Sequence, residues 1–494
     1  MIDRNKLLYI FRIIGSLFLI MGILLVISLL ISVFRREGSS VYLGYLLPIL
    51  LFLILGLLSR KIDLDNGNIS ISAGMVICSL GWFFVSLIAA LPFYIILQIS
   101  YLDALFETVS GFTTTGITVF TEISDMPLSV IFWRSFIQWL GGLGILTFFM
   151  FITFRSETEI WQLFSAEAHK FNTSRPVPNL FKSIRILWSI YILFTLAQTV
   201  ILSLSGVGVF DALTHSFTTI STGGFSRFDS SIAYFQEIGH VNHIFIEYVI
   251  IFFMLMGGIN FLVHYKVFTG DIKELIGDEE AKYFWKIILG TTAFILLIIL
   301  LRDFSDLNFI EESFRKTLFQ VVSVTTTTGY ETEHIGSQFF PEMAQILFLM
   351  LMFIGGCVGS TAGGVKVIRI TVLKKLLFRE IKKFNLPKRA VFPITINGKP
   401  VEKKESLRVT AIVFGWIILI IIGGVLTSLF SHLDPFQSLS GMISAVSNIG
   451  PFYFTVAEMQ ELSPVIKITY IIGMLAGRLE LIPVLILFRR ATWK

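Results

Sequence analysis

Charge and cysteine are both scarce in this sequence. Asp, Glu, Lys and Arg make up 15% of its 494 residues, against about a quarter in a soluble chain. Apolar residues make up 54%, and the mean hydropathy is +0.80. The two cysteines, Cys78 and Cys357, lie within apolar segments, which excludes a disulfide framework, a zinc ribbon or a thiolate cluster. The chain is therefore not a water-soluble protein.

Catalytic and nucleotide-binding signatures are absent as well. The sequence contains no H-E-x-x-H and no Gly-x-Gly-Asp pattern, and no serine–histidine pair stands out. A glycine-rich run at 355–364 is followed by Val365, where a nucleotide-binding loop requires Gly-Lys-Ser/Thr. We therefore expect neither an enzyme nor a cofactor on this chain. An intramembrane enzyme with a spatially assembled catalytic set is the alternative outside transport.

Apolar residues instead gather in long stretches, many of 18 or more residues, the length that crosses the hydrocarbon core of a bilayer. Polar and glycine residues divide these stretches into ten candidate membrane spans. The spans lie near residues 7–34, 41–58, 73–98, 130–153, 183–205, 243–265, 284–301, 342–375, 407–430 and 465–488. The even count places both termini on one side of the membrane.

The distribution of charge predicts which side that is. Residues 366–408 hold thirteen Lys or Arg residues and three Glu residues. Four segments on the opposite side together hold sixteen acidic and four basic residues; they are 99–129, 206–242, 302–341 and 431–464. Because cytoplasmic segments carry the excess of Lys and Arg, we expect both termini to be cytoplasmic.

Each of these four outer segments contains the same pattern, a semi-apolar stretch that runs into Thr or Ser residues and a glycine. In order they read LFETVSGFTTTGIT, LTHSFTTISTGGFS, LFQVVSVTTTTGYE and LSGMISAVSNIGPF. With Gly116, Gly223, Gly329 and Gly450 as the common position, the intervals are 107, 106 and 121 residues. The sequence therefore predicts a fourfold internal repeat of span, half-span, glycine turn and span.

The residue types in this repeat suit a monovalent cation. A helix that stops halfway through the membrane has unpaired carbonyl groups at its carboxyl end. Four such ends around one axis favour a cation between them. A glycine with φ > 0 lets successive carbonyl oxygens turn toward the axis and replace the hydration shell of the ion. Helix packing through small residues would explain one such cluster, whereas four in the same order favour a pore.

The four sequences Thr-Thr-Thr-Gly116-Ile, Ser-Thr-Gly223-Gly, Thr-Thr-Thr-Gly329-Tyr and Ser-Asn-Ile-Gly450-Pro resemble the selectivity filters of the TrkH/KtrB/HKT superfamily of potassium transporters. The resemblance covers the chain from about Ile71 to Lys494, and the two additional amino-terminal spans resemble TrkH more than KtrB. It implies a pseudo-tetramer within one chain, a homodimer, and the cytoplasmic (inner) membrane of a prokaryote. It also implies a cytosolic, TrkA-like, nucleotide-binding regulatory partner.

The expected fold is an all-α polytopic membrane protein of pseudo-fourfold helix–pore-loop–helix, channel-like architecture, preceded by two transmembrane helices. The expected divisions are 1–70 for those two helices, 71–182 for repeat 1, 183–283 for repeat 2, 284–406 for repeat 3 and 407–494 for repeat 4. Each repeat contributes three residues to the expected K⁺ filter. These are Thr114, Thr115, Gly116, Ser221, Thr222, Gly223, Thr327, Thr328, Gly329, Asn448, Ile449 and Gly450.

A gate is expected in repeat 3. The segment from Pro341 to Leu377 has 37 residues, which as one helix would be about 55 Å long, against a bilayer core of about 30 Å. It must therefore break or project, and its middle consists of small residues, as in the intramembrane loop of TrkH-like proteins. The expected gating residues are Gly355, Gly356, Gly359, Ser360, Thr361, Gly363, Gly364 and Arg478.

Arg478 belongs to this set because an ionisable group within a span must face water or a partner, and its Gly-Arg-Leu-Glu setting matches an arginine that the family places below the filter. The alternative is that Arg478 only braces the last helix. Lys366 and Arg369 are expected to be membrane anchors, and the basic stretch 374–408 to contact lipid headgroups or an acidic partner, with no role in nucleic-acid binding.

Two other transport mechanisms remain open. A Na⁺-dependent, KtrB-like K⁺ transporter is the first, although the two additional spans argue against it. A secondary transporter built from inverted repeats is the second, but the four repeats present their loops to the same side, which suits parallel repeats around a pore.

Overall fold

The protein is almost entirely helical. The computed structural model describes residues 4–62, 71–144, 180–303, 306–384 and 392–489. Within these ranges the only strands are β1 (Thr395–Ile396) and β2 (Lys399–Pro400), which form one antiparallel hairpin. The prediction of an all-α polytopic membrane protein is confirmed.

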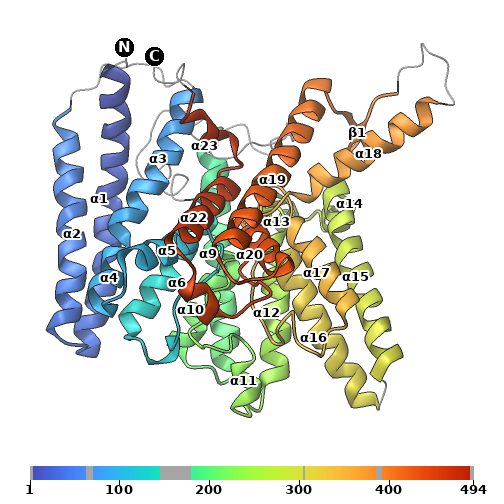
Figure 1. Cartoon of the computed structure of the whole chain (residues 1–494), viewed down its shortest axis with the longest axis horizontal. Coiled ribbons are helices and arrows are strands. Elements are labelled where there is room, and N and C mark those ends of the chain that lie inside the picture. The colour runs from blue at the N-terminus through green and yellow to red at the C-terminus, as the bar shows by residue number, and fades with distance from the viewer. Residues whose placement is uncertain (1–3, 63–70, 145–179, 304–305, 385–391, 490–494) are drawn as a thin grey trace.

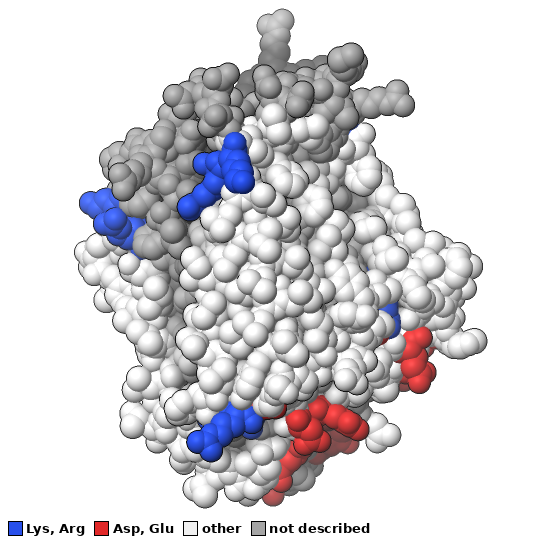
Figure 2. All heavy atoms as spheres, turned by 90° about the vertical axis from the view of Figure 1, so that its left-hand side faces the viewer, with Lys and Arg blue, Asp and Glu red and all other residues white. Residues whose placement is uncertain are grey.

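Six helical segments in the described ranges are long and apolar enough to cross a membrane. They are α1 (Arg4–Arg35), α2 (Ser39–Arg60), α3 (Ile71–Ala89) with α4 (Leu91–Leu97), α9 (Leu180–Leu204), α15 (Glu279–Asp303) and α19 (Lys403–Phe430). On the face formed by α1 and α2, the broad central part carries no charged side chain (Figure 2), as expected of a surface in contact with lipid.

Two predicted spans in the middle of the chain are interrupted. The span near 243–265 is bent by 102° between α12 (His243–Gly258) and α13 (Phe261–Phe268), because Ile259 is extended and the Asn260 side chain caps α13. The span near 342–375 breaks, as expected, into α17 (Glu342–Phe353) and α18 (Val367–Lys383). Part of the span predicted near 130–153 lies outside the described residues.

The last predicted span is not continuous either, which corrects the prediction for 465–488. Helix α22 (Pro464–Arg478) ends before Glu480 and Leu481, whose φ values are 63° and 66°, and α23 (Ile482–Ile486) follows. The two consecutive residues with positive φ end α22, and Pro483 then lies in the first turn of α23, where a missing N–H group costs no intrahelical hydrogen bond. The Ser79 hydroxyl of α3 donates to the Pro483 carbonyl (2.8 Å), so α23 lies at the same end of the molecule as the start of α1 (Figure 1).

Four helices each end at one of the four glycine sequences and lie among the other helices (Figure 1). They are α5 (Tyr101–Phe112), α10 (Val209–Ile220), α16 (Leu307–Thr325) and α20 (Pro435–Ser447). We call them the short helices, although α16, with 19 residues, is longer than the other three. Side chains fix the starts of three of them: Ser100, Asp306 and Asp434 accept hydrogen bonds from backbone N–H groups of the first turn. The remaining short elements are η1 (Ile123–Asp125), α11 (Tyr234–Glu237), α14 (Glu274–Gly277) and α21 (Val456–Glu461).

After each short helix the chain continues into another helix, and that helix packs against the next short helix. Helix α6 (Leu128–Gly142) packs against α10, α12 against α16, α17 against α20, and α22 against α5. The last contact joins the carboxyl-terminal part of the chain to the first short helix, so the series closes on itself.

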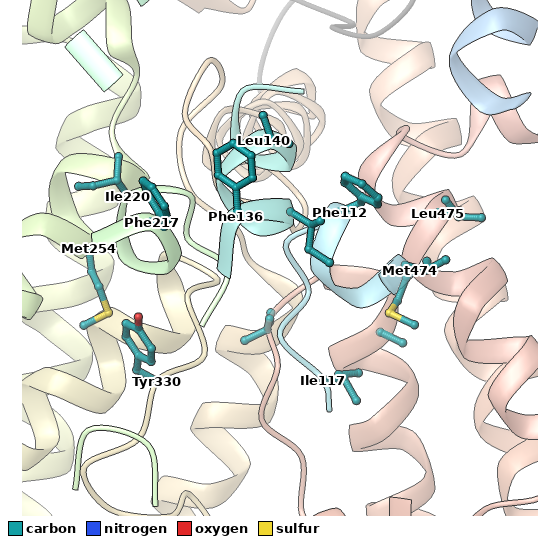
Figure 3. Close-up of a cluster of buried hydrophobic side chains, with 14 of the residues drawn as sticks. Phe112, Ile117, Phe136, Leu140, Phe217, Ile220, Met254, Tyr330, Met474 and Leu475 are labelled. Carbon is teal, nitrogen blue, oxygen red and sulfur yellow. The ribbon is translucent and has the colours of Figure 1, made fainter. Parts of the chain in front are cut away.

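Apolar side chains fill the space between these helices. Figure 3 shows Phe136 and Leu140 of α6 between Phe217 and Ile220 of α10 on one side and Phe112 of α5 on the other. The ring centroids of Phe136 and Phe217 are 5.8 Å apart, a favourable separation for aromatic pairs. This packing holds the carboxyl ends of α5 and α10 in place.

Candidate functional site

A turn of one conformation follows each short helix. In each turn one residue is left-handed and the glycine two residues later also has a positive φ. The left-handed residues are Thr114 (53°), Thr222 (51°), Thr327 (56°) and Asn448 (53°). The glycines are Gly116 (82°), Gly224 (77°), Gly329 (83°) and Gly450 (114°). We call residues 113–116, 221–224, 326–329 and 447–450 the glycine turns.

The register predicted for the second glycine turn is wrong by one residue. Gly224, and not Gly223, has the positive φ that Gly116 has in the first turn. Ser221 caps α10 as Thr113 caps α5, so Ser221 corresponds to Thr113 rather than to Thr114. Sequence could not decide this because either residue of a Gly-Gly pair adopts positive φ readily.

Backbone hydrogen bonds confirm the corrected register. In all four glycine turns, the N–H of the residue after the left-handed one donates to the carbonyl five residues earlier, as in a Schellman-type helix end. The pairs are Thr115 to Ser110 (2.8 Å), Gly223 to Thr218 (2.8 Å), Thr328 to Ser323 (2.9 Å) and Ile449 to Ser444 (3.2 Å). Thr115, Gly223, Thr328 and Ile449 are therefore equivalent.

The four glycine turns meet one another. A β-carbon on Gly116 would lie 2.3 Å from the Gly223 carbonyl oxygen, and one on Gly224 would lie 1.9 Å from that of Thr328. A β-carbon on Gly329 would lie 1.9 Å from the Ile449 oxygen, and one on Gly450 would lie 3.2 Å from the Thr115 oxygen. The contacts run from turn 1 to 2, 3, 4 and back to 1, so the turns form a closed ring with no room for side chains at the glycines.

The chemistry of this ring is that of neutral oxygen. Its residues are Thr, Ser, Asn, Ile and Gly, with hydroxyl groups and backbone carbonyls and no carboxylate. The carboxyl ends of four helices, where partial negative charge accumulates, adjoin it. Among the described residues, no three His, Cys, Asp or Glu side chains are grouped to hold a metal ion. The arrangement suits a weakly held monovalent cation.

A buried ion pair that the sequence analysis did not single out braces this ring. Glu107 of α5 and Arg134 of α6 are 0% and 2% exposed, and Arg134 Nε lies 2.6 Å from Glu107 Oε1. Glu107 accepts hydrogen bonds from the Thr118 hydroxyl (2.9 Å) and the Val119 N–H (3.1 Å), just after the first glycine turn. A signal existed, because charged residues within apolar segments require partners.

Arg134 also reaches the segment after the second glycine turn. Its Nη1 donates to the Ser226 carbonyl (2.7 Å), and its guanidinium lies 3.6 Å from the centroid of the Phe225 ring. Two further pairs join neighbouring helices of the series: the buried pair of Arg315 in α16 with Glu247 in α12, and the pair of buried Lys467 in α22 with partly exposed Asp103 in α5. Charge pairs therefore hold the short helices to their neighbours.

The loop 354–366 separates α17 from α18 and contains seven of the predicted gating residues. Its ends are joined, because Gly355 N–H donates to the Val365 carbonyl (2.9 Å) and Val365 N–H to the Phe353 carbonyl (3.2 Å). Close approaches require glycine here: a β-carbon on Gly355 would lie 1.9 Å from the Gly363 oxygen. The expected break in this span follows from this folding of the loop.

Helices α12 and α15 hold the loop from outside. Cys357 N–H donates to the Gly258 carbonyl (2.9 Å) at the end of α12. The buried carboxylate of Glu280, in α15, accepts from Val358 N–H (2.9 Å) and from Ile368 N–H (3.0 Å) through the same oxygen, Oε1. The other predicted loop residues have contacts on this side. Gly356 lies against the Gly258 carbonyl, Gly359 (φ 76°) against Asn260, and Ser360 donates to the Cys357 carbonyl (2.6 Å).

The structure brings the loop and the glycine turns together. The Thr361 hydroxyl donates to the Ile220 carbonyl at the end of α10 (2.9 Å). The Thr222 hydroxyl lies 3.2 Å from the Thr361 hydroxyl. Gly363 N–H donates to the Thr327 hydroxyl (2.6 Å). A β-carbon on Gly363 would lie 2.4 Å from the Ser447 carbonyl oxygen, whereas Gly364 (φ 68°) lies against Gly355. The loop therefore contacts glycine turns 2, 3 and 4 directly or through the helix end.

Arg478 completes the contact with the first glycine turn. Its Nη1 donates to the Thr114 hydroxyl (3.0 Å) and the Thr361 carbonyl (2.9 Å), and its Nη2 donates to the carbonyls of Gly141 and Gly142. The partners named here are uncharged oxygens, from a glycine turn, from the loop and from the end of α6. One planar guanidinium thus joins three elements.

Arg369 corrects one expectation. It was expected to be a membrane anchor, but its side chain is 2% exposed and pairs with the Glu480 carboxylate in the break between α22 and α23. Lys366 donates to the Ala362 carbonyl within the loop. Both cations are therefore used inside the protein, next to the loop.

Comparisons with known proteins show the family of the chain. Residues 48–493 match the TrkH family, described as cation transport proteins. The chain is 35% identical to an uncharacterised cation transporter of Methanocaldococcus jannaschii, over 98% of this chain and 96% of that protein. It is 32% identical to the Trk system potassium uptake protein TrkH of Escherichia coli, over 98% of both chains.

A solved structure is similar over the whole length. The crystal structure of the potassium transporter TrkH from Vibrio parahaemolyticus superimposes with a TM-score of 0.86 and 29% sequence identity, covering 99% of this chain and 100% of that chain. These are proteins of transport and not enzymes. The chain belongs to the TrkH family of cation transport proteins.

Proposed function

We propose that this protein takes up K⁺ across the cytoplasmic membrane of a prokaryote, through a pore lined by the four glycine turns. The observation that carries the proposal is the closed ring in which each turn's positive-φ glycine faces a carbonyl oxygen of the next turn. The similar proteins of Escherichia coli and Vibrio parahaemolyticus are potassium transporters by name.

The expected selectivity follows from the chemistry of the ring. Carbonyl and hydroxyl oxygens can replace the hydration shell of K⁺ or Rb⁺ without binding it too tightly to leave. Carboxylates, which would favour divalent cations, are missing from the ring. Each turn has one positive-φ glycine and one left-handed residue, fewer ordered carbonyls than a longer filter loop provides. Na⁺ should therefore be disfavoured but not excluded.

The loop 354–366 and Arg478 are the proposed gate. The loop is built mainly of small residues and contacts the turns directly. Charged groups lie at its end, at Lys366, and just after it, at Arg369. Opening requires the loop to leave Thr222 and Thr327, and a cytosolic TrkA-like regulatory partner would supply the energy. The proposal includes a homodimer, cytoplasmic termini and membrane lipid around the apolar surface.

The division into an amino-terminal pair and four repeats supports the same function. Helices α1 and α2 precede the first short helix, and the TrkH chains match along 98% of their length. Divisions at 71–182, 183–283, 284–406 and 407–494 give each repeat one short helix and one glycine turn. A pseudo-fourfold, channel-like pore is the architecture that we propose for these repeats.

Flux into liposomes tests the function. The purified protein is reconstituted and uptake is compared under K⁺, Rb⁺ and Na⁺ gradients, with and without a cytosolic nucleotide-binding partner. We expect K⁺ and Rb⁺ to enter faster than Na⁺, and Gly116→Ala to remove this preference, because the added β-carbon would meet the Gly223 oxygen at 2.3 Å.

The matched control is Gly239→Ala. Gly239 also has a positive φ (66°), but nothing lies within 4 Å of its added β-carbon. The control carries the same backbone strain without the clash in the ring. Equal K⁺ and Na⁺ uptake by the unmodified protein, with or without its partner, contradicts the proposed function.

A further inference from the structure

Gln138 contacts the second glycine turn through both ends of its side-chain amide. It lies in α6, its side chain is fully buried, and its Nε2 donates to the Gly223 carbonyl at 2.6 Å. Its Oε1 accepts from the Phe225 N–H at 3.0 Å. The two hydrogen bonds lie on either side of Gly224, so one amide spans the positive-φ glycine of the turn.

The same side chain explains why residue 223 is glycine. Gly223 does not have a positive φ, in contrast to Gly224, so backbone conformation does not demand glycine there. A β-carbon on Gly223 would lie 2.5 Å from both Cδ and Oε1 of Gln138. At the equivalent position the other three turns have Thr115, Thr328 and Ile449. The Gln138 amide occupies the space that a side chain fills in those turns.

The second turn needs such support more than the others. Two consecutive glycines have the greatest conformational freedom of any dipeptide, and the Gly223 carbonyl lies in the ring, facing Gly116. A small shift of this oxygen changes the distances on which discrimination between ions depends. The donor end of the amide holds the oxygen, and the acceptor end holds the N–H of Phe225 in the segment that follows.

We propose that Gln138 is a positioning residue that determines K⁺ selectivity by fixing the Gly223 carbonyl in the ring. This inference rests on the proposed function. Gln138 acts through the backbone of the second turn and does not touch the ion. Loss of the Gln138 amide should change the selectivity between ions more than the rate of uptake.

Two substitutions separate the parts of the amide. Gln138→Leu removes both hydrogen bonds, whereas Gln138→Glu keeps an acceptor for Phe225 N–H and loses the donor to Gly223. The Rb⁺/Na⁺ uptake ratio in liposomes should fall about three- to tenfold in both variants, as expected for the loss of one or two buried hydrogen bonds. A purely structural defect would lower uptake of both ions together and leave this ratio unchanged.

Gln198→Leu is the matched control. Gln198 is likewise fully buried and donates to the Thr219 hydroxyl of α10 at 3.0 Å, but its hydrogen bond is to the helix and not to the turn. The ratio should stay at the unmodified value in this variant. A ratio that falls equally in Gln198→Leu and Gln138→Leu would overturn the assignment to Gln138.

A compensating pair keeps the proposal testable if Gln138→Leu does not fold. Gly223→Thr alone should be poorly tolerated, because its side chain meets Gln138. Gln138→Ala with Gly223→Thr removes the three atoms nearest to the added β-carbon and recreates the residue of turns 1 and 3. We expect the double variant to discriminate Rb⁺ from Na⁺ better than either single variant. No recovery in the double variant, together with an unchanged ratio in Gln138→Glu, overturns the proposal.

The assay distinguishes the two levels of inference. Unmodified protein that does not prefer Rb⁺ over Na⁺ removes the proposed function and this inference with it. If the unmodified protein prefers Rb⁺ and both Gln138→Leu and Gln138→Glu keep the unmodified Rb⁺/Na⁺ ratio, only the role of Gln138 is contradicted.

Discussion

The Thr327 hydroxyl accepts a hydrogen bond of 2.6 Å from the Gly363 N–H, and this contact joins a glycine turn to the loop 354–366. Thr327 has a left-handed backbone, as do Thr114 and Thr222, although this conformation costs a β-branched residue on the order of 1–3 kcal/mol. All three hydroxyls are used: by Gly363, by Arg478 and by Thr361. The strain is kept where the side chain connects the ring to the loop.

Replacing Thr327 with Val tests this connection. Valine keeps the β-branch, the volume and the backbone strain, but it leaves the buried Gly363 N–H without its acceptor. An unsatisfied buried donor costs about 1–3 kcal/mol, so the substitution destabilises the closed position of the loop. We therefore expect basal Rb⁺ uptake into liposomes, without a partner protein, to rise at least several-fold.

Thr325→Val is the control for that substitution. Thr325 is also fully buried, at the end of α16, and its hydroxyl has no hydrogen-bond partner among the described residues. Its uptake should equal that of the unmodified protein. If Thr327→Val also takes up Rb⁺ at the unmodified rate, the hydroxyl does not hold the loop.

Arg478 gives a second prediction, which separates charge from geometry. Its guanidinium donates to oxygens of Thr114, Thr361, Gly141 and Gly142 at the same time, and no ammonium group can match this planar fork. We expect Arg478→Lys and Arg478→Gln both to raise basal uptake about tenfold or more, since hydrogen bonds to charged donors contribute about 1.5–3 kcal/mol each.

The measurement is again Rb⁺ uptake without a regulatory partner. If Arg478→Lys behaves as the unmodified protein while Arg478→Gln leaks, positive charge alone closes the pore, and the hydrogen bonds to the loop carry no weight. That outcome would replace the mechanical role of Arg478 with an electrostatic one.

Glu107 and Arg134 give a prediction about stability. Both side chains are at most 3% exposed, and removal of one partner of such a pair leaves an unpaired buried charge, which costs about 3–5 kcal/mol. Glu107→Gln should therefore lower the thermal unfolding midpoint in detergent by several degrees. Asp303→Asn is the control, because its pair with Arg302 is about half exposed, and such pairs contribute little. Equal midpoints in both variants would show that the buried pair is not needed.

The sequence predicted those features that one residue type must supply. A positive φ beside a closely packed carbonyl oxygen needs glycine, so the four turns are visible in the sequence as a repeat. A 37-residue segment is too long for one span, so the break before α18 is expected. The roles of Gly223 and Gly224 could not be predicted in this way, because either of two adjacent glycines can adopt the positive φ. In the structure Gly224 has the positive φ and Gly223 packs against Gln138.

The sequence did not predict which residues far apart in the chain would pair with each other. Arg134 meets Glu107 and Ser226, and Arg369 meets Glu480, only because helices pack in a particular order. Sequence spacing does not encode that order. Pro483 was a local signal for the start of a new helix, α23, but the apolar run around it concealed the break.

Glu280 carries the last prediction, about how the loop is held from behind. A single carboxylate oxygen accepts from Val358 N–H, inside the loop, and from Ile368 N–H, at the start of α18. Glu280→Leu leaves both buried donors unpaired, so the loop should open more readily and basal Rb⁺ uptake should rise. Glu280→Gln retains an oxygen in the same place and should stay close to the unmodified rate, because the acceptor rather than the charge holds the backbone. Equal leakage from both variants would mean that the negative charge of Glu280 is what keeps the loop in place, beside Lys366 and Arg369.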